Sequence, residues 1–223
     1  MNRSEWIKAR RHETEERYDT LWAPEYGERW GMYPNATHLV FIEKFLNLLS
    51  PHSKVLDAAC GAGRYMPYLL GKGHVVVGID QSQGMLAKAR AKFPAVQTEK
   101  VGLQEMTFRS EFDGAICMDA MENVSPEDWP LVLGNLKRAL KLQGYLYFTV
   151  EIPGVEELLE IDTAFKKGKE QVLPIVHGEC IDSTVYHYYP AMEQVREWVQ
   201  QAGLAVMEDA EGDGYHHVLT RKI

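Results

Sequence analysis

Short apolar runs alternate with amphipathic segments through the middle of the chain. The runs between residues 54 and 151 predict strands at KVLDA, HVVVGID, AVQTEKV, FDGAICM and YLYFTVE. The segments between them have helical spacing, and parallel strands need crossover connections of that length. VVVGI and GAICM are apolar throughout, which is typical of strands buried on both faces of a sheet. The pattern therefore predicts an α/β fold built on a parallel sheet.

The segments on either side of this core have a different pattern. Residues 1–35 are charged and aromatic and predict a helical cap. Residues 151–189 predict a lid insertion that contains the charged helix GVEELLEIDTAFKKGKE. Residues 190–223 predict a closing helix and an antiparallel hairpin around a glycine-containing turn. We expect a single domain over 1–223, with the ligand-binding core at 36–150.

Two helices of the core have boundary signals in the sequence. NATHLVFIEKFLNLLSP predicts a helix that Asn35 caps and that ends before Pro51. SPEDWPLVLGNLKRALKLQG predicts a helix that Ser125 caps and that Gly144 ends.

Composition narrows the class of protein. The chain has 223 residues and a net charge of -8, which disfavours a nucleic-acid partner because such a partner needs a basic face. Cys60, Cys117 and Cys180 are odd in number and widely spaced, which indicates a reducing compartment. The polar N-terminus has no apolar signal-peptide core, and no apolar run is long enough to span a bilayer. We expect a cytoplasmic protein with no membrane partner.

The turn after the first strand carries the first chemical signal. Asp57 ends that strand, and the residues that follow are almost all Ala or Gly as far as Gly63. In a parallel sheet, ligands lie beyond the carboxyl ends of the strands, and small residues let the backbone approach them closely. An acid at this point would repel a phosphate. It suits a cation instead, such as an amino group or a sulfonium.

A second acid ends the neighbouring strand. Asp80 lies 19 positions after Gly61 (80 - 61), where a carboxylate can accept hydrogen bonds from both hydroxyls of a ribose. The expected ligand therefore has a ribose and a positively charged part, and S-adenosylmethionine has both.

Four segments together resemble the class I S-adenosylmethionine-dependent methyltransferases. VLDAACGAGRY is similar to their first motif and VVVGIDQSQGMLAKAR to their second. FDGAICMDAMENV resembles the fourth-strand motif, and LKRALKLQGYLYFTV resembles the helix and fifth strand that follow. The resemblance implies a Rossmann-like, seven-stranded, mostly parallel sheet with a C-terminal antiparallel hairpin. It implies S-adenosylmethionine as cofactor and in-line methyl transfer to O, N or C of a small-molecule acceptor.

The same resemblance implies a set of cofactor-binding residues. Four would line the methionine end, and an arginine would reach the methionine carboxylate: Asp57, Ala59, Gly61, Gly63 and Arg64. Asp80 would hold the ribose, with Gln81 and Met85 beside the adenine. Further contacts would come from the backbone of Leu103, from Gln104, which replaces an acid absent at Gly102, and from Met118 near the sulfonium.

A catalytic base is needed only if the acceptor arrives protonated. Candidate segments are DAMENV, Glu151 and GECIDSTVYHYY, and within them we favour His187, whose unperturbed pKa is near neutral. The alternative is that His187 is structural and that catalysis depends on proximity. A lid of aromatic residues would exclude water or simply pack the cap against the sheet; its candidates are Trp6, Trp22, Tyr26, Trp30, Tyr33, Tyr186, Tyr188 and Tyr189.

Three other functions stay open from the residues. A nicotinamide-dependent oxidoreductase would need a glycine three positions after Gly63, where Met66 stands. A non-catalytic nucleoside-binding regulator would use the same scaffold, and aminopropyl transfer from the decarboxylated cofactor is a minor variant. No metal is predicted, because His177, Glu179 and Cys180 match no strong zinc spacing.

Overall fold

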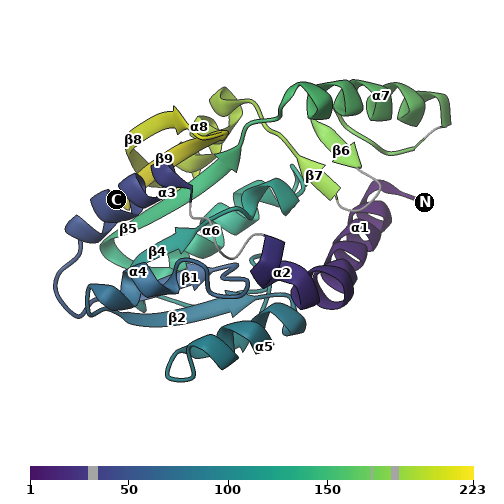
Figure 1. Ribbon diagram of the computed structural model, residues 1–223. Helices are drawn as coiled ribbons and strands as arrows, with labels where there is room; N and C mark the ends of the chain where they lie inside the picture. Colours follow the sequence, from purple (N-terminus) through teal and green to yellow (C-terminus); the bar gives the residue numbers. More distant parts are fainter. Residues whose placement is uncertain (30–34, 172, 182–185) are drawn as a thin grey trace.

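The computed structural model describes residues 1–29, 35–171, 173–181 and 186–223, and its centre is a seven-stranded sheet of order β3-β2-β1-β4-β5-β9-β8 (Figure 1). Strand β9 is antiparallel to both of its neighbours, and the strands from β3 to β5 are all parallel. This confirms the expected mostly parallel sheet with a closing hairpin. The strands are β1 Lys54–Ala58, β2 Val75–Asp80, β3 Gln97–Lys100, β4 Phe112–Cys117, β5 Leu140–Glu151, β8 Leu204–Gly212 and β9 Tyr215–Lys222.

Helices cover both faces of the sheet. Helices α3 (Ala36–Asn47), α4 (Met66–Gly71) and α5 (Gln83–Lys92) pack on one face, and α6 (Trp129–Ala139) and α8 (Met192–Gln201) pack on the other. Neighbouring strand residues alternate between the two cores, as the strand period of two requires: Val55 joins the first and Leu56 the second. The strand order reverses between β1 and β4, so the ligand site is expected at their carboxyl ends.

The helix predicted from Ser125 to Gly144 is shorter than expected. Residues 126–128 form a turn, and α6 begins at Trp129 after its cap residue Asp128. It ends at Ala139 because Leu140 already pairs with Phe112 of β4. Both errors arise at positions where pairing and turn geometry override helix propensity.

Two segments far apart in the sequence cover the carboxyl ends of the strands. The first is α1 (Arg3–Arg17), a π-helical turn η1 (Tyr18–Trp22) and α2 (Ala23–Arg29). The second is α7 (Val155–Gln171) and an antiparallel pair formed by β6 (Glu179–Ile181) and β7 (Tyr186–Tyr188), which the sequence did not predict. Helix α1 lies beside the β6–β7 pair (Figure 1). Trp30 and Tyr33, two of the expected lid residues, lie outside the described residues.

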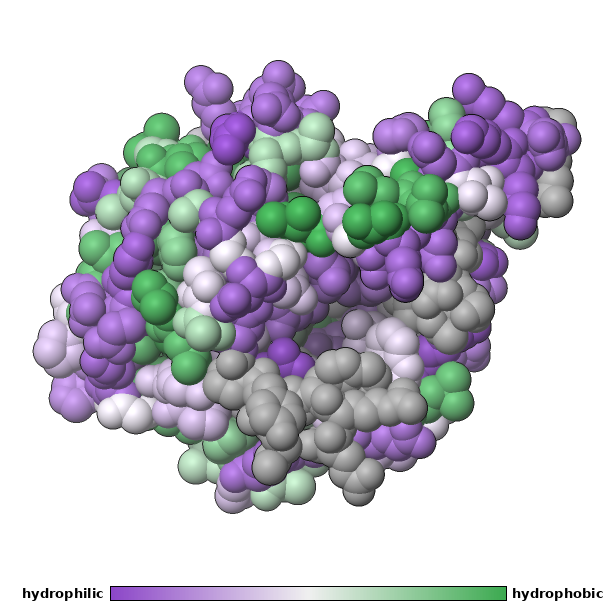
Figure 2. Space-filling view, turned by 45° about the horizontal axis from the view of Figure 1, so that its top comes forward, coloured by the Kyte–Doolittle hydropathy of each residue, from purple (hydrophilic) through white to green (hydrophobic). Residues whose placement is uncertain are grey.

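Hydrophobic side chains reach the surface near the second cover (Figure 2). On α7, Val155, Leu158 and Leu159 are all more than half exposed. Helix α7 therefore packs lightly on the rest of the molecule, and its main contact is with β6. No helix within the described ranges has both the length and the apolar character needed to cross a membrane.

Candidate active site

The turn after β1 bends toward the tip of β2. Ala59, Gly61 and Gly63 all have positive φ, at 58°, 52° and 81°. Two backbone N–H groups fix the bend: Cys60 donates to the Ile79 carbonyl and Gly61 donates to Asp80 Oδ2, both at 2.8 Å. The conformation explains the run of small residues, because positive φ and a bare backbone both disfavour large side chains.

Asp80 holds this turn and the next one with the same carboxylate. Its Oδ2 accepts from Gly61 N, and its Oδ1 accepts from Ser82 N at 2.8 Å. A carboxylate has about four acceptor sites, so each oxygen keeps one for a ligand. Burial raises the pKa of Asp80 to about 6, against the effect of these two donors. The group is therefore mostly ionised at neutral pH and faces the site as an acceptor.

A cavity of about 350 Å³ lies beyond the carboxyl ends of the strands. It brings together most of the residues predicted from the sequence: Ala59, Gly61, Arg64, Asp80, Gln81, Met85, Leu103, Gln104, Met118 and His187. Figure 2 shows the hollow on the face that carries the two covers. The roles assigned to these residues remain predictions. The residues already line one cavity, so they could act together on one ligand without a change in the fold.

Two predicted residues do not line the cavity. Asp57 is only 2% exposed and lies behind the turn, where no described residue donates a hydrogen bond to its Oδ2. Burial, with a contribution from the Asp80 charge, raises the pKa of Asp57 to about 8. Gly63 serves the packing beneath the turn: an added Cβ would lie 2.9 Å from Met66 Sδ and from a ring atom of Phe93.

The first cover forms the roof of the cavity with Arg11, Thr14, Tyr18, Trp22 and Tyr26. Asp19 attaches it to α5, because its Oδ1 accepts from Ser82 Oγ at 2.5 Å and from Gly84 N at 2.8 Å. Ser82 caps α5 by accepting from Met85 N, and Asp19, more than sixty positions earlier in the chain, adds a second acceptor at the same helix end. Sequence reasoning missed Asp19, and nothing in the local pattern distinguishes it from the other charged residues of this segment.

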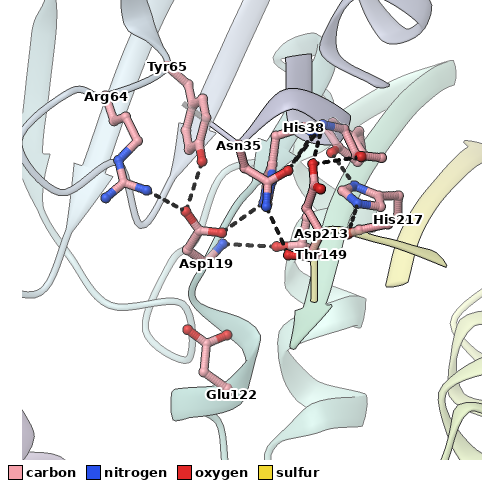
Figure 3. Close-up of polar contacts among 12 residues, drawn as sticks. Asn35, His38, Arg64, Tyr65, Asp119, Glu122, Thr149, Asp213 and His217 are labelled. Carbon is pink, nitrogen blue, oxygen red and sulfur yellow. Dashed lines mark hydrogen bonds and ion pairs between the residues drawn. The ribbon is translucent and has the colours of Figure 1, made fainter. Parts of the chain in front are cut away.

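A cluster around Asp119 forms one wall (Figure 3). Asp119 Oδ2 accepts from the Tyr65 hydroxyl at 2.8 Å and from the Arg64 guanidinium at 3.1 Å, and its Oδ1 accepts from His38 Nε2 at 2.9 Å. Its backbone N–H donates to Thr149 Oγ1 at 2.9 Å. Burial alone would raise the pKa of Asp119, but these donors hold it below its usual range.

Two further carboxylates lie near this wall. Glu122 belongs to the short helix η2 (Met121–Asn123), which packs against β5, and Glu151 ends β5. Both line the cavity. Burial is the main cause that raises the pKa of both carboxyl groups. The pKa of Glu151 rises to about 7. The pKa of Glu122 rises well above its ordinary value, and the charge of Glu151 contributes to this shift. Sequence analysis named Glu151 as a candidate and included Glu122 in the segment DAMENV, but it favoured His187.

His187 lies on β7, in the second cover, and lines the cavity. Its Nδ1 is 3.2 Å from the Tyr189 hydroxyl. Within the described part of the chain, no three His, Cys, Asp or Glu side chains gather closely enough to hold a metal ion.

The sequence is similar to known methyltransferases. Residues 55–144 match the family described as a methyltransferase domain. An uncharacterized methyltransferase from Synechocystis is 31% identical over 97 residues, a match that covers 43% of this chain and 46% of that protein. The ubiquinone biosynthesis O-methyltransferase of Histophilus somni is 27% identical over 197 residues, which is 83% of this chain and 76% of that protein. The middle of the chain is therefore similar to a methyltransferase domain, and most of the chain is similar to a methyltransferase.

The fold of the chain agrees with solved methyltransferase structures as well. The 1,6-didemethyltoxoflavin-N1-methyltransferase of Burkholderia thailandensis, solved with its substrate and S-adenosylhomocysteine, aligns with a TM-score of 0.70 at 16% identity. The alignment covers 100% of this chain and 91% of that one, so it includes both covers as well as the sheet.

Proposed function

We propose that this methyltransferase moves the methyl group of S-adenosylmethionine to a small-molecule acceptor. The observation that supports it is the cavity of about 350 Å³ under two covers. One part of its wall comes from the ends of β1 and β2 and the turn after β3, around Gly61, Asp80 and Leu103. The other part comes from the segments after β4 and β5 and from β9, around Glu122, Glu151 and Tyr215. A cofactor and a small acceptor fit this division.

The residues of the first part suit the cofactor. The spare acceptor sites of Asp80 match two ribose hydroxyls, and the bare backbone of Ala59 and Gly61 admits the chain of a methionine. Asp57, a buried carboxyl with an unpartnered oxygen, lies behind this position and suits a nearby cation. When bound, S-adenosylmethionine supplies a methyl group on a sulfonium that is already a good leaving group.

The protein contributes alignment and the exclusion of water. Asp119 holds Arg64, Tyr65 and His38 in one network, so the wall beside the reacting groups is rigid. Holding an acceptor in line at ~3 Å can supply several kcal/mol, and a base adds about 100-fold where the acceptor must lose a proton. His187 and Glu151 both line the cavity and are the candidate bases. The two named enzymes above methylate oxygen and nitrogen, respectively, so kinship leaves the attacking atom open.

Calorimetry with S-adenosylhomocysteine and NAD tests the proposal. We expect the first to bind and the second not to bind. Replacing Asp80 with Ala removes the ribose acceptor, so the affinity for S-adenosylhomocysteine should fall about 10-fold or more. Asp162→Asn, on the exposed face of α7, is the matched control and should bind normally.

Labelled cofactor then identifies the acceptor class. With the methyl label and a cell extract split by size, the label should enter the small-molecule fraction. Label confined to protein or nucleic acid contradicts the small-molecule proposal, and tight NAD binding without S-adenosylhomocysteine binding contradicts the cofactor. His187→Ala separates the two candidate bases: a normal kcat would leave His187 a structural role.

A further inference from the structure

The part of the cavity around Glu122, Glu151 and Tyr215, where we place the acceptor, contains a buried carboxylate with an unpartnered oxygen. Glu122 is 7% exposed, and no donor among the described residues reaches its Oε2. Its Oε1 has a long contact, 3.3 Å from Asn123 Nδ2, and the backbone N–H of Glu122 also interacts with the carboxylate. Figure 3 shows the carboxylate of Glu122 pointing toward the Asp119 cluster without joining its hydrogen bonds. A buried carboxylate with an unused oxygen is costly unless a ligand completes it.

Glu151 adds a second carboxylate beside the first. Of all charged groups, Glu151 has the largest effect on Glu122. Repulsion of this kind is tolerated where it serves a ligand, since two adjacent acids bind a cation better than one does.

The neighbouring charges do not neutralise this pair. Asp119 already has three donors of its own, and Arg64 is one of them. The titratable groups that line the cavity around the pair, or act on its charge, are Tyr18, Arg64, Asp119, Glu157, His187, Tyr189 and Tyr215. Most of these are acids or phenols, and the two arginines that line the cavity pair with other acids, Arg11 with Glu105 and Arg64 with Asp119. A cationic ligand would supply the charge that the pair lacks.

We propose that the acceptor is a small basic amine, bound as its ammonium ion by Glu122 and Glu151. The inference rests on the proposed function and specifies its substrate class. Aromatic residues at the same cavity, Tyr18, Trp22 and Tyr215, suit the organic part of such a cation. An anionic acceptor would be repelled, and a neutral alcohol would leave the carboxylates without a counter-charge.

Methyl transfer to such an amine needs one base, and Glu151 can provide it. Glu151 accepts one proton from the ammonium ion, which frees the nitrogen lone pair. That lone pair forms the N–C bond while the C–S electron pair returns to sulfur, giving S-adenosylhomocysteine. The product is a methylated ammonium ion, and the proton held by Glu151 passes to water. Sulfonium and ammonium thus become a neutral sulfide, an ammonium ion and one proton.

Matched probes on the enzyme loaded with S-adenosylhomocysteine test the proposal without turnover. The probes are ethylamine, 2-phenylethylamine and tryptamine, each with the alcohol and the carboxylate of the same skeleton. We expect at least one amine to bind ~10-fold or more tightly than its alcohol, and the carboxylates to bind least. With methyl-labelled cofactor, the label should appear on nitrogen.

Variants assign the effect to the pair. Glu122→Gln combined with Glu151→Gln should remove the preference for amines and leave the affinity for S-adenosylhomocysteine within ~2-fold. Glu156→Gln, exposed on α7, should change neither. Equal or better binding of an alcohol or carboxylate, a preference that survives in the double variant, or no amine binding at all would overturn the proposal. Failure of the cofactor product itself to bind would instead overturn the proposed function.

Discussion

Asp57 and Asp80 end neighbouring strands, yet they lie in different environments. Asp80 accepts two backbone N–H groups and opens to the cavity, whereas Asp57 is buried with an unpartnered oxygen. Their positions followed from the strand pattern, because a residue that ends a parallel strand must lie at one edge of the sheet. Their environments did not, since burial depends on Cys60 and the turn in front of Asp57.

Replacing Asp57 with Asn should make the ligand-free protein less sensitive to pH. The raised pKa means that the folded state binds a proton more tightly than the unfolded state between about pH 4 and pH 8, so unfolding free energy falls as pH rises through that window. From pH 5 to pH 8 this loss should be at least about 2 kcal/mol smaller in the variant. Urea unfolding at several pH values measures it. An unchanged slope would mean that Asp57 is ionised in the fold.

At the scale of elements, the two covers are joined to each other. Arg3 of α1 donates to both oxygens of Glu179 on β6, at 2.5 and 2.8 Å, and Glu179 is fully buried. Glu179 also accepts from the Tyr186 hydroxyl at 2.6 Å, and Trp6 lies edge-on to the Tyr186 ring. Part of the expected aromatic lid therefore joins cover to cover, while Trp22 and Tyr26 face the cavity.

Arg3→Met should loosen both covers at once. It leaves the Glu179 carboxylate buried without its cation, which costs about 3 kcal/mol unless the segment opens. Hydrogen exchange of α1 and of strands β6 and β7 should then accelerate together, ~10- to 100-fold. Lys72→Met, which breaks an exposed pair with Glu43, is the control and should leave both segments unchanged. Acceleration of one segment alone would show that the covers move independently.

At the scale of the whole molecule, the sheet was predictable from the sequence. The contacts by which the two covers close the site were not. Buried strands and crossover helices have local signals, such as the apolar run at Val75–Ile79 and the Asn35 cap that α3 uses as expected. The contacts that close the site join distant residues: Asp19 with Ser82, and Arg3 with Glu179. The local sequence around a charged residue does not show which distant residue it contacts, so these links are visible only in the structure.

Gly84→Ala tests how far the first cover controls the cofactor. An added Cβ would lie 2.9 Å from Ala23 Cβ and 3.1 Å from the Asp19 carbonyl, so the cover must move away from α5. Such overpacking costs about 1–3 kcal/mol, and S-adenosylhomocysteine should dissociate ~5-fold or more faster in stopped-flow experiments. Gly134→Ala, where α6 leaves open space, is the control: it should stabilise the fold slightly and leave dissociation unchanged.

The attachment of Asp19 to α5 also affects the order in which parts of the chain fold. Residues 1–29 are synthesised before their partners Ser82, Gly84 and Glu179, which lie 63 to 176 positions later in the chain. This segment therefore docks late, because the residues that it packs against must be synthesised and folded first. Pulsed labelling during refolding should find its amides protected after those of β1 and β4.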